Sequence, residues 1–155
     1  MNNRELSRQL QVLKSLFDKV KALPEGDIEI ISHWAKYLCV LTAGFIENSL
    51  SEVYIDFTAR SSSSHVASFS RKVLSQIQNP KTERFIEITS SFNKSWGDDL
   101  ELFVGENGRR EAINSIMTNR HKIAHGESSD ITYHRLRDYL SKAIEVIEFI
   151  EQQCC

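Results

Sequence analysis

The side chains that could carry chemistry in this chain are concentrated in one segment, Asn119 to Gly126, which reads Asn-Arg-His-Lys-Ile-Ala-His-Gly. The guanidinium of Arg120 can bind a phosphate through two hydrogen bonds and stabilise the negative charge that builds on it during cleavage. A histidine such as His125 can take a proton from a ribose 2′-hydroxyl or give one to a leaving oxygen. This set of groups suits the cleavage of RNA without a metal ion.

Helical geometry would bring these groups together at one helix end. In a helix, His121 and His125 lie one turn apart on the same face, and Arg120 lies about 140° around the axis from His125, within reach of its long side chain. Asn119 adds an amide donor and acceptor. Gly126 is of the residue type that most often follows a helix. The carbonyl end of the helix favours a protonated His125 as an acid or anion binder.

The surrounding stretch from Arg109 to Arg137 is locally basic. It contains six Lys and Arg residues and three Asp and Glu residues, whereas the whole chain carries a net charge of -2. The overall charge excludes a strong field that would attract nucleic acid over the whole surface, while a local basic patch fits contact with RNA. The alternative interpretation is a solvated helix surface, with Arg120 as a surface cation and His125 as a helix cap.

Apolar residues recur every three or four positions through most of the chain, which indicates helices. Six Gly and two Pro provide too few turns for a sandwich or barrel of short strands. We therefore predict an all-α fold, a single helical bundle of four main helices plus one or two shorter helices, formed by one domain over residues 1–155. The expected helices cover residues 6–23, 28–59, 65–78, 79–92, 109–124 and 132–150, with Asn79-Pro80 as the cap and first residue of the fourth helix and a loop from Ser95 to Gly108.

The three cysteines do not have the spacing of a disulfide framework. We expect Cys39 to be buried as a small hydrophobic side chain, and Cys154 and Cys155 to form a frayed tail. This use of cysteine is typical of a protein of the reducing cytoplasm.

The large aromatic residues of the second predicted helix fit a core better than a surface for stacking RNA bases. We therefore expect Trp34, Tyr37, Phe45 and Tyr54 to be buried. The longest near-apolar run, residues 37–46, is too short to span a bilayer, so no membrane contact is expected.

Metal binding by the two motif histidines is not expected, although His121 and His125 have the spacing of a helical ligand pair. The helix motif of zinc proteases requires Glu directly after the first His, and Lys122 stands there instead. No Cys lies nearby to complete a ligand set. We predict no metal and no cofactor.

The residues from Arg120 to His125 resemble the motif of the HEPN superfamily, which is named for its occurrence in higher eukaryotes and prokaryotes and for nucleotide binding. That motif is an Arg, a polar residue, several spacers and a His at the end of a helix in a bundle of four or five helices. His121 occupies the polar position, and Gly126 and a final amphipathic helix also match. Ala43 to Glu47 looks like the acidic position of several HEPN groups. The chain is most similar to HEPN domains of prokaryotic conflict systems.

The resemblance implies a metal-independent endoribonuclease that acts as a toxin, in phage defence or in RNA processing. Arg120 and His125 would be catalytic, and His121 would assist them. Glu47 would orient the Arg or the His, on a looser match to the family. Asn119 and Lys122 would bind or orient the substrate.

The resemblance also implies partners and a second class of function. RNA would be the substrate, two copies of the chain would form a homodimer with one composite site, and an antitoxin protein, such as a small nucleotidyltransferase, could accompany it. Many HEPN domains have no nuclease activity and serve as modules for dimerisation or for binding proteins or nucleotides. A purely structural helical bundle inside a larger assembly is a third alternative.

Overall fold

The computed structural model describes residues 1–155 and contains seven α-helices and no strand, which confirms the predicted all-α fold. The helices are α1 (Arg4–Lys21), α2 (Ile28–Ser61), α3 (Ser64–Leu74), α4 (Thr82–Phe92), α5 (Lys94–Val104), α6 (Arg109–Ala124) and α7 (Tyr133–Gln153). Four helices are 16 to 34 residues long and three have 11 residues each, where one or two short helices were predicted. None of the helices combines the length and apolar character needed to cross a membrane.

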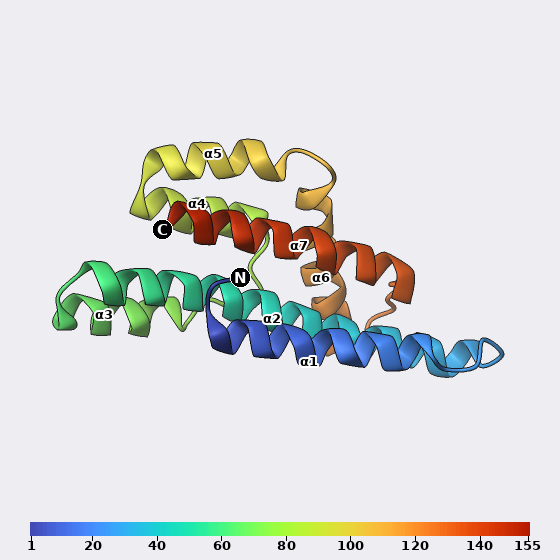
Figure 1. Cartoon of the computed structure of the whole chain (residues 1–155). Coiled ribbons are helices and arrows are strands. Elements are labelled where there is room, and N and C mark those ends of the chain that lie inside the picture. Colours follow the sequence, from blue (N-terminus) through green and yellow to red (C-terminus); the bar gives the residue numbers. More distant parts are fainter.

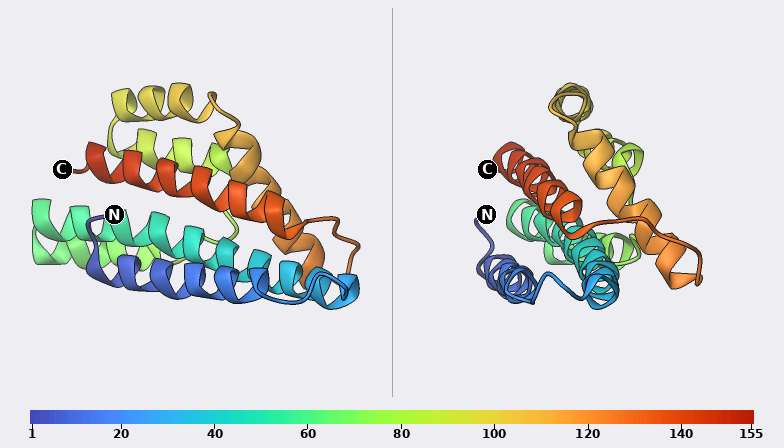
Figure 2. Two further views of the ribbon diagram at one scale, coloured as in Figure 1. Left: turned by 45° about the vertical axis from the view of Figure 1, so that its right-hand side comes forward. Right: turned by 90° about the vertical axis from the view of Figure 1, so that its right-hand side faces the viewer.

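The helices are arranged in two layers that one steeply inclined helix joins (Figure 1). α1, α2 and α3 lie alongside one another in one layer, and α4, α5 and α7 form the other (Figures 1 and 2). α6 runs across both layers, from the end of α5 down to the side of α2 (Figure 2). A single cluster of 33 buried residues fills the space between the helices.

α2 is the central helix, with α1, α3, α6 and α7 packed around it. It begins at Ile28 because the Asp27 carboxylate accepts a hydrogen bond from the backbone N–H of Ile30 at 3.2 Å. Neighbouring residues are buried together at Phe45-Ile46 and again at Tyr54-Ile55, so more than one face of the helix is covered. A helix that is apolar on more than one face needs neighbours on several sides, and α2 has them.

The predicted loop from Ser95 to Gly108 is wrong, because most of it forms α5. Asn93 starts this helix, since its side chain accepts hydrogen bonds from the N–H groups of Ser95 and Trp96 at 2.9 and 3.3 Å. Gly97, which belongs to the predicted loop, lies buried where α5 comes close to Ser90 of α4. The glycine therefore serves close helix packing rather than a loop.

The predicted start of the fourth helix at Asn79-Pro80 is also wrong. Asn79 adopts a left-handed conformation with φ of 48°, and α4 begins only at Thr82. The side chain of Asn114 on α6 completes this helix start, accepting hydrogen bonds from the N–H and the hydroxyl of Thr82 at 2.9 and 2.6 Å. The preceding helix, α3, accordingly ends at Leu74 instead of at residue 78.

The observed burial of the aromatic and cysteine residues agrees only in part with the burial predicted from the sequence. Phe45 and Tyr54 are buried as predicted, but Trp34 and Tyr37 are 37% and 51% exposed, which corrects their assignment to the core. Cys39 is fully buried as expected. Cys154 was assigned to a frayed tail and is instead buried against the end of α2, where its carbonyl accepts a hydrogen bond from Arg60 at 3.3 Å.

The contact at Gly97 predicts a strong asymmetry between two helical glycines. A Cβ atom added at Gly97 would lie 1.8 Å from the Ser90 hydroxyl oxygen, whereas one added at Gly44 of α2 meets nothing within 4 Å. Gly97→Ala should lower the free energy of unfolding by about 1–3 kcal/mol through overpacking. Gly44→Ala should raise it by up to about 1 kcal/mol, because alanine is the better helix former. Chemical denaturation of both variants tests this, and equal effects would contradict the packing described.

Thiol burial predicts that one cysteine reacts far faster than the others. Burial raises the pKa of the Cys39 thiol to about 12 and that of Cys154 to about 11, whereas Cys155 is exposed. Because the thiolate is the reactive form, brief iodoacetamide treatment of the folded protein at pH 8 should add one label. Intact mass spectrometry measures the adduct, which Cys155→Ser should abolish. Two labels added at similar rates would show that Cys154 is accessible.

Candidate functional site

The candidate site lies at the C-terminal end of α6, where the helix leaves the core. Ile113, Ile116 and Met117 are fully buried and fix the middle of α6 between α2 and α7. The helix ends at Ala124 as predicted, with His125 as its cap and Gly126 in the left-handed conformation at φ of 69°. A hydrogen bond from the N–H of Glu127 to the carbonyl of Lys122, at 2.8 Å, closes this end.

Of the three predicted catalytic residues, His121 and His125 lie side by side at the C-terminal end of α6. The imidazole rings of His121 and His125 face each other with centroids 4.4 Å apart and an interplanar angle of 52°, and both side chains are exposed. Arg120 precedes His121 in the helix and is half-buried. None of the three side chains makes a hydrogen bond or salt bridge within the chain, so a fixed cation and two imidazoles stay free for a ligand.

Asn119 holds the turn after the helix and faces into the chain. Its amide donates a hydrogen bond to the carbonyl of Ser115 at 2.9 Å, and its oxygen accepts one from the hydroxyl of Ser129 at 2.7 Å. The residue therefore ties the α6–α7 turn to the helix that carries the histidines. Ser129 is a positioning residue that sequence inspection missed, because its partner lies ten positions away. Lys122 is half-buried with no ion pair.

Glu47 lies on α2 and is engaged elsewhere in the single chain. Its carboxylate accepts a hydrogen bond from the backbone N–H of Asn79, and so supports the left-handed turn before α4. No salt bridge joins Glu47 to Arg120, and no hydrogen bond or salt bridge joins it to His125. The predicted orienting role of Glu47 stays a prediction to which this geometry lends no support.

Fewer unpaired positive charges lie near the site than the six Lys and Arg residues counted between Arg109 and Arg137. Arg109 is buried, bonded to Glu145 at 2.8 Å, and stacks on the Phe103 ring at 3.8 Å from its centroid. Arg110 pairs with Glu83 of α4. These two cations stabilise the start of α6, far along the helix from the histidines. Of the six cations counted between Arg109 and Arg137, the other four have no salt bridge to an acidic residue: Arg120, Lys122, Arg135 and Arg137.

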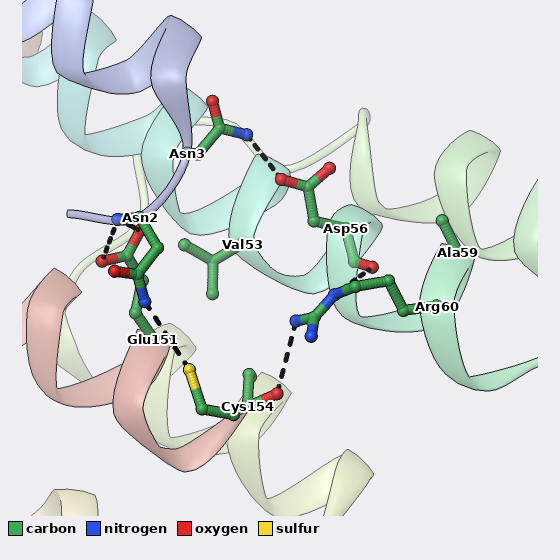
Figure 3. Close-up of a pocket in the computed structure, with 9 residues that line it drawn as sticks. Asn2, Asn3, Val53, Asp56, Ala59, Arg60, Glu151 and Cys154 are labelled. Carbon is green, nitrogen blue, oxygen red and sulfur yellow. Dashed lines mark hydrogen bonds between the residues drawn. The ribbon is translucent and has the colours of Figure 1, made fainter.

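The side chains of His121 and His125 are open to solvent. The best-defined hollows of the molecule are lined by other residues, and one of them lies where the chain ends meet α2 (Figure 3). There the buried carboxylate of Glu151 accepts hydrogen bonds from the N–H of Asn2 at 3.0 Å, and Arg60 donates to Cys154 (Figure 3). The first contact ties the segment before α1 to α7, and the second ties the end of α2 to the end of α7. No group of three or more His, Cys, Asp or Glu side chains is placed to hold a metal ion.

An exposed apolar face occupies the first turns of α2, at the same end of the molecule as the C-terminal end of α6 (Figures 1 and 2). Ile28 is 80% exposed and Ile30 is 47% exposed, and a hollow of about 280 Å³ is lined by Ile30, His33, Trp34 and Tyr37. The sequence places Trp34 and Tyr37 in the core because it shows only that these side chains are large and apolar. Which apolar side chains the other helices cover depends on the tertiary arrangement.

Comparison with known proteins supports the assignment suggested by this motif. Searches of curated proteins and of solved structures gave no significant match. The profile of the RiboL-PSP-HEPN family matches residues 4–155, and so includes all seven helices and the Arg120–His125 motif at the end of α6. The match confirms the resemblance to HEPN domains, and the chain belongs to the RiboL-PSP-HEPN family.

Proposed function

We propose that this protein is a metal-independent endoribonuclease of the HEPN type. The observation that carries the proposal is the C-terminal end of α6, where the rings of His121 and His125 lie 4.4 Å apart, Arg120 directly precedes them, and none of the three side chains has a partner within the chain. An arginine and two histidines without partners add little to the stability of a fold. Their shared position is instead typical of a site that binds a phosphate and transfers protons.

The proposed reaction is a transfer of the phosphodiester to the neighbouring ribose oxygen. Arg120 binds the non-bridging oxygens of the scissile phosphate and stabilises their charge in the transition state. A neutral imidazole takes the proton of the 2′-hydroxyl as its oxygen bonds to phosphorus. A protonated imidazole gives a proton to the 5′-oxygen as that bond breaks, which leaves a 2′,3′-cyclic phosphate and a 5′-hydroxyl. We assign His125 as the acid or base, with His121 in support.

Two copies of the chain would complete this site. A single chain leaves the imidazoles of His121 and His125 exposed to solvent, and exposed groups bind a flexible substrate weakly because little of it is removed from water. The exposed apolar face of α2, with Ile30, Trp34 and Tyr37, lies at the same end of the molecule and would form the contact between copies (Figure 2). A cleft between two such ends would contain both motifs and would suit a role as a toxin, in phage defence or in RNA processing.

Loss of His125 should abolish RNA cleavage. His125→Ala removes the proton-transfer group and should slow cleavage of a mixed RNA pool about 10²–10⁴-fold with EDTA present. Arg120→Ala should slow it about 10²–10³-fold, because the charge on the phosphate is no longer stabilised. Gel electrophoresis of end-labelled RNA measures the rate and identifies the cyclic phosphate.

Matched controls are available on the same chain. His65 and Arg4 are exposed and have no partners, so His65→Ala and Arg4→Ala should cleave at the wild-type rate. If His125→Ala stays folded and cleaves as fast as the wild type, the assigned site is wrong. If the dimeric wild-type protein cleaves none of the RNA, the non-catalytic binding module becomes the better interpretation.

A charge placed on the exposed face of α2 should separate the two copies. Trp34→Glu should weaken self-association about 30-fold or more, as expected for the loss of a central aromatic contact worth about 2 kcal/mol. Analytical ultracentrifugation measures the association, and the cleavage rate should fall with the dimer fraction. Leu102→Glu on α5 is the control, because Leu102 is also exposed but lies on a different helix. A dimer unaffected by Trp34→Glu would place the contact elsewhere.

A further inference from the structure

The outer face of α3 is unusually apolar for a surface helix. Val66, Phe69 and Val73 are 52%, 70% and 48% exposed, and their spacing of three and four residues places them in one stripe. Leu74 is the only buried residue of α3, which packs mainly on α2. The helix therefore leaves three large apolar side chains exposed to solvent and buries one against its own chain.

This stripe forms one wall of a groove, and α4 forms the other. The hollow has a volume of about 230 Å³ and is lined by Phe69, Ser70, Val73, Leu74, Ile77, Arg84, Ile88, Ser91 and Phe92. Most of these side chains are apolar. A groove between two helices is concave, so it fits the ridge of side chains on a third helix better than a flat bilayer surface.

The groove lies in a strongly basic part of the chain. No acidic residue occurs between Asp56 and Glu83, while Arg60, Arg71, Lys72 and Lys81 all fall in this interval. Lys72 is exposed, has no ion pair, and follows Phe69 by three residues, so it flanks the apolar stripe on the helix surface. Arg84 lines the opposite wall, with Glu87 2.7 Å away as its only acidic partner.

We propose that the groove between α3 and α4 binds an amphipathic helix of another protein, one whose apolar stripe is flanked by acidic residues. Phe69 and Val73 would pack against the apolar side chains of that helix, and Lys72 and Arg84 would pair with its carboxylates. The apolar lining favours a protein helix over RNA, whose backbone would require a row of cations without a hydrophobic groove. The site does not include Arg120 or His125, so the proposal is independent of nuclease activity.

The probe for this proposal is a synthetic 18-residue helical peptide with leucines at positions i, i+3, i+4 and i+7 and glutamates on either side. Two matched peptides replace the glutamates with lysines or scramble the leucines. The glutamate peptide should bind at least about 10-fold more tightly than either, measured by fluorescence anisotropy. Its binding should shift the amide NMR signals of residues 64–92 rather than those of α6.

Variants of the groove and matched controls make the test specific. Phe69→Glu and Lys72→Glu should each weaken binding of the glutamate peptide at least about 10-fold. Phe69→Ala removes the same aromatic ring without adding a charge. Leu102→Glu changes an exposed apolar residue and Lys19→Glu an exposed lysine, both on other helices, and both variants should leave binding unchanged. Circular dichroism verifies that each variant is folded.

Four results would overturn the proposal. Equal binding of the glutamate and lysine peptides, or unchanged binding by Phe69→Glu, would show that the groove does not select an acidic helix. If the His125→Ala protein binds RNA and the His125→Ala/Lys72→Glu protein does not, this face belongs to a nucleic-acid site. Binding to vesicles of anionic lipid that Phe69→Glu abolishes would assign it to a membrane surface.

Discussion

Burial of α2 is the constraint on which the rest of this structure depends. A helix of 34 residues is about 51 Å long, and this one is apolar on more than one face. Leaving such a helix in water would cost about 1.5–3 kcal/mol for each large side chain such as Ile46 or Leu50. Four helices therefore pack around it, and their directions follow from the faces they must cover. α6 is steeply inclined because it crosses from one layer to the other while packing on both α2 and α7 (Figure 2).

That inclination explains why the candidate site is exposed. The middle of α6 is held by Ile116 and Met117 in the core, and its last turn projects past the helices that cover them. Arg109 and Arg110, at the other end of α6, have acidic partners and stabilise the fold. Arg120 has none. The same helix thus carries cations that serve structure at its start and a cation free for a ligand at its end.

Two apolar faces lie outside the core, near opposite ends of α2 (Figure 1). One is formed by the first turns of α2 near the candidate site, and the other by α3 beside α4. The exposed side chains of these faces, such as Trp34 and Phe69, do not belong to the buried core cluster. Exposed apolar faces of this kind are typical of surfaces that meet other molecules. Their separation along α2 would allow one chain to meet a second copy at one end and a different protein at the other.

The sequence alone determined the all-α character of the fold, the extent of α6 and the pairing of His121 with His125, because all three depend on local geometry. Residues one turn apart in a helix must lie together, and Gly126 ends a helix through its own backbone freedom. Tertiary contacts decided the rest. Gly97 lies within a helix because Ser90 packs against it, and α4 starts at Thr82 because Asn114, distant in sequence, completes its end. Apolar periodicity cannot show which faces neighbouring helices cover, and so the exposure of Trp34 and Phe69 emerged only once the seven helices were packed.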